Sequence, residues 1–517
     1  MSLRGLAIKS STLLRRALTP SLADVFFVAL LLAAFLRPGG LQALLEDGDT
    51  GWHVRTGELI LATGSAPRVD PYSFSRPGQP WCDWEWLADA AFARVWQWRG
   101  LGGVATLAAV TLCSASAALL LWLLRRGVGL WIAAGVALAA FSASSVHYLA
   151  RPHVFSILLY TLSLWALDED RRRPGRWIWL LIPAAGLWAN LHGGFVALLA
   201  TLALAAAVSC LQKRWRWARR YGLLTALCLA ATGLNPYGWK LHGHIVEYLR
   251  SSWILDHVQE FQSPAIRSEG MVVFAVLLLC GIAMAARRMA GGEWFEGALA
   301  SIWGLAALRS ARHIPFFAIA AAPAIAAEWA LWWQGIAERA PLRSARRIFR
   351  DLGRDLGQTP RVSVWLALSA AVALAAAGVV GDFPAARFPV AAVAHNRSLL
   401  APPGWQPRIL TSDQWADYLI YRFYPRQRVF FDGRSDFYGP DLGADYVRLA
   451  GAQDGCRQLL DRYRFEVALL PRDWPLGALL DGDGGWKREY RDAVATLYVR
   501  QGIPEARRAA PDKELRP

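Results

Sequence analysis

Long apolar stretches dominate the pattern of hydrophobic and polar positions in this chain. Residues 102–124, 127–146, 154–167 and 362–380 carry no charged side chain. Each approaches or reaches the length that crosses a bilayer, about 20 residues. Further apolar stretches, the first at about 20–37, bring the predicted number of transmembrane helices to about eleven. The pattern therefore predicts an α-helical polytopic membrane protein.

Composition and charge agree with this fold class. Hydrophobic residues make up 55% of the chain and charged residues 19%, whereas a soluble domain has about 25% charged residues. The net charge is +16, which in a soluble protein would suggest nucleic acid. Here the basic residues form short clusters between the apolar stretches, so we expect no nucleic-acid partner. No P-loop is present, so we also expect no nucleotide hydrolysis.

The basic clusters predict an orientation in the membrane. If the N-terminus is cytoplasmic, alternate loops carry the positive charge, as expected for cytoplasmic loops. These loops are 125–126, 171–176, 213–220, 287–288 and 335–361. The exceptions are Arg309 and Arg312, which fall on the other side. We expect a multi-pass protein of the bacterial cytoplasmic (inner) membrane whose C-terminal region is extracytoplasmic.

The chain divides into three predicted parts. Residues 1–381 form a transmembrane domain, which includes an outer loop over 38–100. Within that loop an amphipathic helix is predicted over 84–98, with an apolar face suited to the membrane interface. Residues 382–502 predict a small extracytoplasmic α/β domain, and residues 503–517 a disordered tail. The apolar face of the amphipathic helix consists of Trp84, Leu87, Ala91, Val95 and Trp98.

The C-terminal domain is predicted to be α/β because helix-type and strand-type sequence patterns alternate along it. Helices are expected at 413–424, capped by Ser412 or Asp413, and at 456–463. The four expected strands are 408–410, 428–431, 467–470 and 493–499. Cys82 and Cys456 lie in outer regions, where they could pair in an oxidising compartment or remain two free thiols.

The clearest candidate for a catalytic or metal-binding site is the acidic segment directly after the first helix. Asp47 and Asp49 flank Gly48, so both carboxylates can point to one site. Two close carboxylates can provide one group with a raised pKa and one base, or can hold a divalent cation. A carboxylate there could also take a proton from an acceptor hydroxyl. The alternative is a solvated loop with a helix cap at Asp49 or Thr50.

A second group of polar residues gathers at the outer ends of other helices. Arginine and lysine bind phosphate well, so this group could hold a lipid phosphate, although ordinary interfacial residues would have the same composition. Its members are Arg151, His153, His192, Lys240, His242, Arg309, Arg312 and His313.

Two segments of the C-terminal domain are also candidates. The sequence Asp432-Gly433-Arg434 could bind a ligand or form a salt-bridged turn. The segment 413–421, which includes Asp417, could be a recognition face or simply a half-buried helix.

An apolar helix, an acidic Asp-x-Asp motif and a long outer loop with an interfacial helix together resemble the C-type glycosyltransferase superfamily. That group includes protein O-mannosyltransferases and lipid A aminoarabinose transferases. The chain is more closely similar to a set of bacterial membrane proteins described only as glycosyltransferase-like. The segments that carry the resemblance are DGDTGWHVRTGELIL, PRVDPYSF, WCDWEWLAD, LWANLHGGF, LNPYGW, RSARHIPFF and RVFFDGRSDFYG.

The resemblance implies a membrane glycosyltransferase that moves a sugar from a polyprenyl-phosphate-linked donor to an extracytoplasmic lipid, glycan or protein. Asp47 or Asp49 would act as the base or help to hold a metal ion, the one cofactor to consider. Arg151, Arg309, Arg312 and Lys240 would hold the donor phosphate. His53, Arg55 and the outer histidines would complete the binding set. The Asp-Glu pair typical of the characterised transferases is absent here.

A non-catalytic role remains the alternative. A membrane carrier or assembly protein for an envelope lipid or polysaccharide would bind a ligand without turnover. In that case the basic outer residues would matter and the acids would not.

Overall fold

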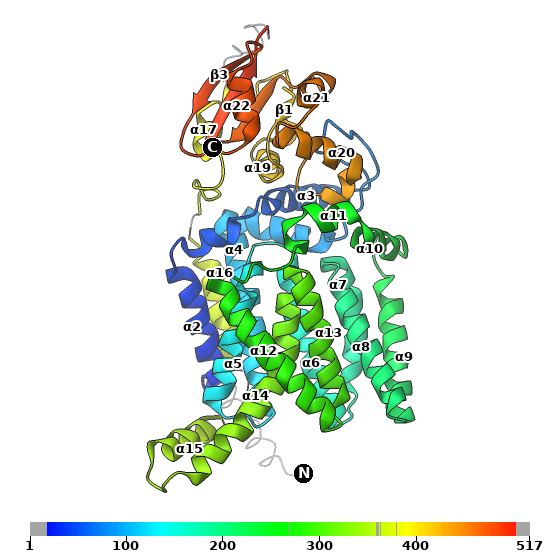
Figure 1. Cartoon of the computed structure of the whole chain (residues 1–517), viewed down its shortest axis with the longest axis vertical. Coiled ribbons are helices and arrows are strands. Elements are labelled where there is room, and N and C mark those ends of the chain that lie inside the picture. Colours follow the sequence, from blue (N-terminus) through cyan, green and yellow to red (C-terminus); the bar gives the residue numbers. More distant parts are fainter. Residues whose placement is uncertain (1–17, 268, 358–360, 362, 379, 503–517) are drawn as a thin grey trace, which may run out of the picture.

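The computed structural model describes residues 18–267, 269–357, 361, 363–378 and 380–502. It shows a helical bundle with a smaller domain stacked on one end (Figure 1). The segment predicted to be disordered, 503–517, lies outside the described residues.

Long helices run side by side in the bundle (Figure 1). Among the described residues, four helical segments are long and apolar enough to cross a membrane: Trp86–Arg125, Leu130–His147, Met271–Ala290 and Ala311–Arg339. The polytopic helical fold is therefore confirmed, while the number of about eleven spans stays a prediction. The bundle helices are α2 (Leu22–Leu36), α4 (Trp86–Arg125), α5 (Leu130–Ser144), α6 (His153–Arg172), α7 (Leu181–Leu191), α8 (Phe195–Leu211), α9 (Trp215–Thr232), α12 (Glu269–Ala290), α13 (Trp294–Arg309), α14 (Ile314–Arg339) and α16 (Val364–Ala375).

A kink divides α4 into two limbs. Arg99 and Gly100 leave helical geometry there, and the φ angle of Gly100 is 59°, a value that favours glycine. The first limb corresponds to the amphipathic helix predicted over 84–98. It buries Ala88, Phe92 and Ala93, whereas the predicted apolar face next to them remains partly exposed.

Three more helices lie across the same end of the bundle (Figure 1). They are α3 (Asp49–Thr63), α10 (Lys240–Arg250) and α11 (Ser252–His257). The sequence pattern did not predict them. Helix α3 is buried between α4 and the C-terminal domain, and its buried residues include Thr50, Gly51 and His53. A helix covered on two sides has no single apolar stripe for the pattern to reveal.

The C-terminal domain contains one four-stranded sheet of order β1-β2-β4-β3. Strand β1 is parallel to β2, and the other pairs are antiparallel. The four strands are β1 (Ile409–Leu410), β2 (Val467–Pro471), β3 (Trp486–Arg491) and β4 (Ala495–Arg500). The helices are α17 (Val390–His395), α18 (Arg397–Leu400), α19 (Asp413–Phe423), α20 (Ser435–Ala450), α21 (Cys456–Arg462) and α22 (Pro475–Asp481).

Several local predictions for this domain can be checked against the structure. Ser412 caps α19 by accepting a hydrogen bond from the Trp415 backbone N–H at 3.2 Å. The strand predicted at 428–431 is wrong, because Val429 forms only an isolated bridge to Ser73 of the outer loop. Cys82 and Cys456 are both free thiols, which is the second of the two alternatives that the sequence left open.

A buried ion cluster joins the C-terminal domain to the outer loop. Arg434 Nη2 lies 2.9 Å from Asp70 Oδ1 and 2.6 Å from Asp432 Oδ2. The guanidinium also lies 4.6 Å from the ring centroid of Trp81. Asp432-Gly433-Arg434 is thus the salt-bridged turn that the sequence left as one of two alternatives. Because all three charged side chains are buried, the charge of each is compensated by the others and not by water.

We predict that Arg434→Met destabilises the protein by about 3–5 kcal/mol, because two buried carboxylates lose their counter-ion. Thermal unfolding in detergent should show a lower Tm for this variant, and protease should cut the C-terminal domain more readily. The matched control is Arg426→Met at an exposed position of the same domain. Equal stability of the two variants would contradict the assigned role of the ion cluster.

Candidate functional site

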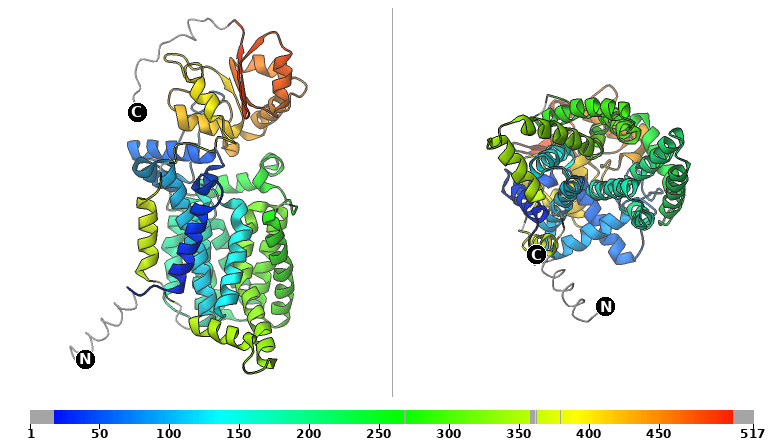
Figure 2. Two further views of the ribbon diagram at one scale, coloured as in Figure 1. Left: turned by 90° about the vertical axis from the view of Figure 1, so that its left-hand side faces the viewer. Right: turned by 90° about the horizontal axis from the view of Figure 1, so that it is seen from below.

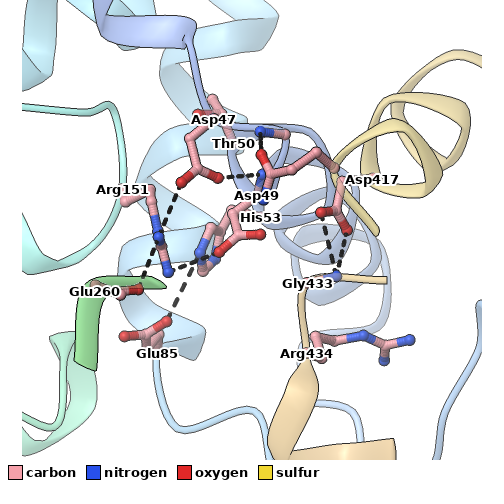
Figure 3. Close-up of polar contacts among 12 residues, drawn as sticks. Asp47, Asp49, Thr50, His53, Glu85, Arg151, Glu260, Asp417, Gly433 and Arg434 are labelled. Atoms are coloured by element: carbon pink, nitrogen blue, oxygen red, sulfur yellow. Dashed lines mark hydrogen bonds and ion pairs between the residues drawn. The ribbon is translucent and has the colours of Figure 1, made fainter. Parts of the chain in front are cut away.

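The candidate site lies where the end of the bundle meets the C-terminal domain (Figure 3). Asp47 and Asp49 stand at the start of α3, and Arg151 lies just before α6. Glu260 belongs to η4 (Gln259–Phe261). Chain segments far apart in sequence thus contribute to one group.

Arg151 bridges three carboxylates. Its Nη1 atom lies 3.0 Å from Asp47 Oδ2 and 3.2 Å from Glu260 Oε1. Its Nη2 atom lies 2.7 Å from Asp49 Oδ2. The side chains of Arg151 and Glu260 are each 23% exposed, but that of Asp49 is only 6% exposed. The accessible side of this Arg151 network is therefore formed by Asp47, Arg151 and Glu260.

The start of α3 determines how the two aspartates lie. Asp47 accepts a hydrogen bond from the Asp49 backbone N–H at 2.9 Å, and Asp49 is the first residue of the helix. The positive end of the helix dipole favours carboxylates at this place. The segment is not a solvated loop, since Asp49 is 4% exposed and Thr50 is fully buried.

The C-terminal domain covers the inner side of the network. Both carboxylate oxygens of Asp417, on α19, accept from the Gly433 backbone N–H at 3.2 Å. A Cβ atom at position 433 would collide with Asp49 Oδ1, so only glycine allows this approach. Asp49 Oδ1 is buried and has no hydrogen-bond partner among the described atoms. The Asp49 oxygen that makes no contact with Arg151 is thus covered by the Gly433 loop.

Burial changes the acidity of these carboxyl groups. Desolvation raises the pKa of Asp49 to about 7, with Asp47 adding to the effect and Arg151 opposing it. Desolvation and the nearby Asp49 carboxylate raise the pKa of Asp417 well above its ordinary value. Although burial raises the pKa of Glu260, Arg151 and Arg312 together hold it below its ordinary value. Near neutral pH the site therefore holds a carboxyl group poised between its two protonation states.

A second polar chain runs next to the Arg151 network. His53 Nδ1 lies 2.6 Å from Asp89 Oδ1, and His53 Nε2 lies 3.7 Å from Glu85 Oε2. Glu85 Oε1 in turn lies 3.4 Å from His192 Nε2, and Ser156 bonds the other nitrogen of His192 at 2.7 Å. Burial lowers the pKa of His53 and of His192. Two of the histidines predicted from sequence, His53 and His192, thus lie in one buried network.

Several predicted site residues lie apart from both networks. Arg55 stacks between the rings of Trp96 and Tyr421, at 5.2 Å from each centroid, and donates to the Tyr421 carbonyl at 2.7 Å. It joins α3 to α19. Lys240 is exposed at the start of α10, and Arg309 is exposed at the end of α13.

The remaining predicted residues bind mainly to their own surroundings. His153 Nε2 donates to the His147 carbonyl at 2.5 Å. His242 contacts Thr232 Oγ1 at 2.9 Å, and His313 contacts the carbonyl of Ala306 at 3.3 Å.

Arg312 is the second cation close to the Arg151 network. It is half-buried and donates to Tyr248 Oη at 3.3 Å. Its guanidinium lies 4.3 Å from the ring centroid of Phe261, the residue next to Glu260. It is thus placed to attract an anion that reaches this side of the site.

The structure does not support a metal ion between Asp47 and Asp49. Among the described residues, no group of three or more histidine, cysteine, aspartate or glutamate side chains is arranged to hold one. The guanidinium of Arg151 lies between the two aspartates, where a bridging cation would stand. The donor set present here therefore fits an arginine rather than a metal.

Sequence reasoning did not assign Glu260 or Glu85 to the site, and it left Asp417 in a segment that could be a recognition face or a half-buried helix. Each is an acid in a segment rich in aromatic residues outside the apolar stretches. An acid in such surroundings was the available signal, but only the fold shows which of them reach Arg151 or Asp49.

Comparison with known proteins finds no matching family model and no matching curated protein. Solved structures do match. The archaeal oligosaccharyltransferase AglB from Archaeoglobus fulgidus, in complex with an inhibitory peptide and a dolichol-phosphate, aligns with a TM-score of 0.55 and 12% identity. The match covers 93% of this chain and 74% of AglB.

ArnT from Cupriavidus metallidurans, bound to undecaprenyl phosphate, aligns with a TM-score of 0.50 and 16% identity. That match covers 92% of this chain and 97% of ArnT. Both alignments extend over the bundle and the C-terminal domain rather than over a common helical core alone. The chain therefore shares the fold of AglB and ArnT over most of its length.

Proposed function

We propose that this protein is a membrane glycosyltransferase that moves a sugar from a polyprenyl-phosphate-linked donor to an extracytoplasmic acceptor. The observation that carries the proposal is the buried Asp49 carboxyl, held by Arg151 at 2.7 Å at the end of the bundle. The fold supports it, since solved structures with this fold bind dolichol-phosphate and undecaprenyl phosphate. The acceptor class, whether lipid, glycan or protein, stays open.

In the proposed reaction Asp49 acts as general base. Its carboxylate takes the proton of the acceptor hydroxyl, and the acceptor oxygen bonds to the anomeric carbon of the sugar. The bond from that carbon to the donor phosphate oxygen breaks, and the polyprenyl phosphate leaves. A base with a pKa near 7 suits this task at neutral pH. Asp47 and Glu260 hold Arg151 in place, and Arg151 holds Asp49.

We assign the donor phosphate to the basic residues beside the network. Arg312 is the first candidate, because it lies next to the accessible side formed by Asp47, Arg151 and Glu260. Arg309 and Lys240 are exposed cations that could attract the phosphate to the membrane surface. Arg151 itself is saturated by carboxylates, so its main task is to position them.

The orientation belongs to the same proposal. The C-terminal domain lies at one end of the bundle, and the arginine-rich segment after α14 lies at the other (Figures 1 and 2). Because positive charge favours the cytoplasmic side, we place the C-terminal domain outside the bacterial inner membrane and the N-terminus inside. The domain boundaries proposed are 1–381 and 382–502.

We predict that Asp49→Asn lowers the transfer rate about 10²- to 10⁴-fold, because the general base is lost. Asp47→Asn should cost far less, since Asp47 acts through Arg151. Transfer is measured in proteoliposomes with a pool of labelled polyprenyl-phosphate sugars. Asp454→Asn, at an exposed position, is the matched control.

Wild-type rates in both Asp47→Asn and Asp49→Asn would refute the role of the acids. Donor binding without turnover by the wild-type protein would instead favour the carrier alternative.

We further predict that transfer becomes faster as the pH rises from about 6 to 8. The raised pKa of Asp49, about 7, leaves this base partly protonated at the lower pH. Because the Asp47 carboxylate helps to raise the pKa of Asp49, Asp47→Asn should move the midpoint of this rise to lower pH. The pH profiles of the two proteins are the measurement, and identical midpoints would contradict the assignment.

A further inference from the structure

A basic amphipathic helix lies at the end of the bundle opposite to the candidate site. Helix α15 (Ala345–Gly357) follows α14 and projects across this end (Figures 1 and 2). Its sequence, ARRIFRDLGRDLG, places Ile348, Phe349, Leu352 and Leu356 on one helical face. The arginines occupy the opposite face, as the 3.6-residue period requires.

Most of the apolar face of α15 does not pack against the protein. Ile348 is 60% exposed, Leu352 48% and Leu356 44%. Phe349, at one edge of the apolar face, makes the contact with the bundle. The Trp131 ring of α5 stacks on Phe349 at 4.8 Å, and its indole N–H donates to the Phe349 carbonyl at 3.0 Å. The bundle therefore holds α15 in an orientation that leaves its apolar face open.

The charges around this face are mainly positive. Residues 338–357 contain six arginines and three acids. Asp351 pairs with Arg350 at 2.8 Å and with Arg354 at 3.2 Å, so these charges are partly compensated. Arg343 and Arg346 are exposed and lie at or before the first turn of the helix. They are available to an external anion.

We propose that α15 lies in the membrane surface and that Arg343 and Arg346 bind the headgroups of anionic phospholipids. The exposed apolar side chains would enter the boundary between headgroups and acyl chains, as amphipathic interfacial helices do. The arginines would contact phosphate and the negative surface. A lipid surface would bind both the exposed apolar side chains and the arginines, whereas a soluble anion would bind only the arginines. The inference does not depend on the proposed transferase activity.

The test uses the full-length protein in detergent and measures bound lipid by native mass spectrometry. Phosphatidylglycerol and phosphatidylcholine with identical acyl chains are titrated separately. We expect the wild-type protein to prefer phosphatidylglycerol. The double variant Arg343→Gln/Arg346→Gln should bind this lipid about 30-fold more weakly, since each basic residue near an anionic surface contributes about 1 kcal/mol. Its binding of phosphatidylcholine should not change.

Three further measurements make the test specific. Arg216→Gln/Arg219→Gln removes two exposed arginines of α9, at the same end of the bundle, and should leave phosphatidylglycerol binding unchanged. Ile348→Ser/Leu352→Ser should weaken binding of both lipids. Inorganic phosphate alone should not compete with the lipid. An equal loss in the α9 variant, no preference between the two lipids, or competition by phosphate would each overturn the proposal.

Discussion

The Arg151 network is the interaction on which the end of the bundle depends. It joins the start of α3 and the η4 segment to the turn before α6, where Arg151 lies. Asp47 and Glu260 are each more than a hundred positions from Arg151 in the sequence. Three carboxylates gather at one guanidinium, so removing that single cation would leave like charges facing each other in a poorly solvated place. A solvated ion pair contributes little to stability, but a mostly buried network of this kind fixes which segments can approach one another.

The C-terminal domain is held to the bundle by contacts of the same type. Arg434 bridges this domain to the outer loop through Asp70, and Gly433, its neighbour in sequence, lies against Asp49. The position of the catalytic candidate and the attachment of the domain are therefore linked through one short segment. Helix α3 lies between the two parts and contacts both, so the domain closes the site rather than merely standing beside it.

The sequence predicted those parts of the fold that depend on local composition. Apolar stretches revealed the bundle, and Ser412 revealed the start of α19, because a bilayer and a helix cap impose local requirements. The helices at the end of the bundle were missed, since α3 is buried on two sides and lacks a polar face. Strand β3 was missed because its middle positions are charged and exposed. Val429 has the apolar character of a strand residue, but it pairs with the outer loop instead of the sheet.

The same distinction applies to the site. Asp47, Asp49 and Arg151 could be selected because clustered acids, or a basic residue at the predicted outer end of a membrane helix, are unusual in themselves. Glu260 and Asp417 could not be assigned to them, because their role arises from long-range packing. Arg55 shows the converse: its sequence neighbourhood is that of the site, but its side chain turns to Trp96 and Tyr421.

The uneven exposure of the network has a chemical consequence. Asp47, Arg151 and Glu260 face the accessible side, and the open oxygen of Asp49 faces the Gly433 loop. A general base that is shielded from water has a raised pKa and binds its proton strongly. It takes a proton from a hydroxyl readily only if that hydroxyl is also shielded from water. In the proposed reaction, an acceptor that reaches this oxygen would displace the Gly433 loop, and with it the salt-bridged turn of Arg434. The contact that excludes water from Asp49 would then also be the contact that the acceptor replaces.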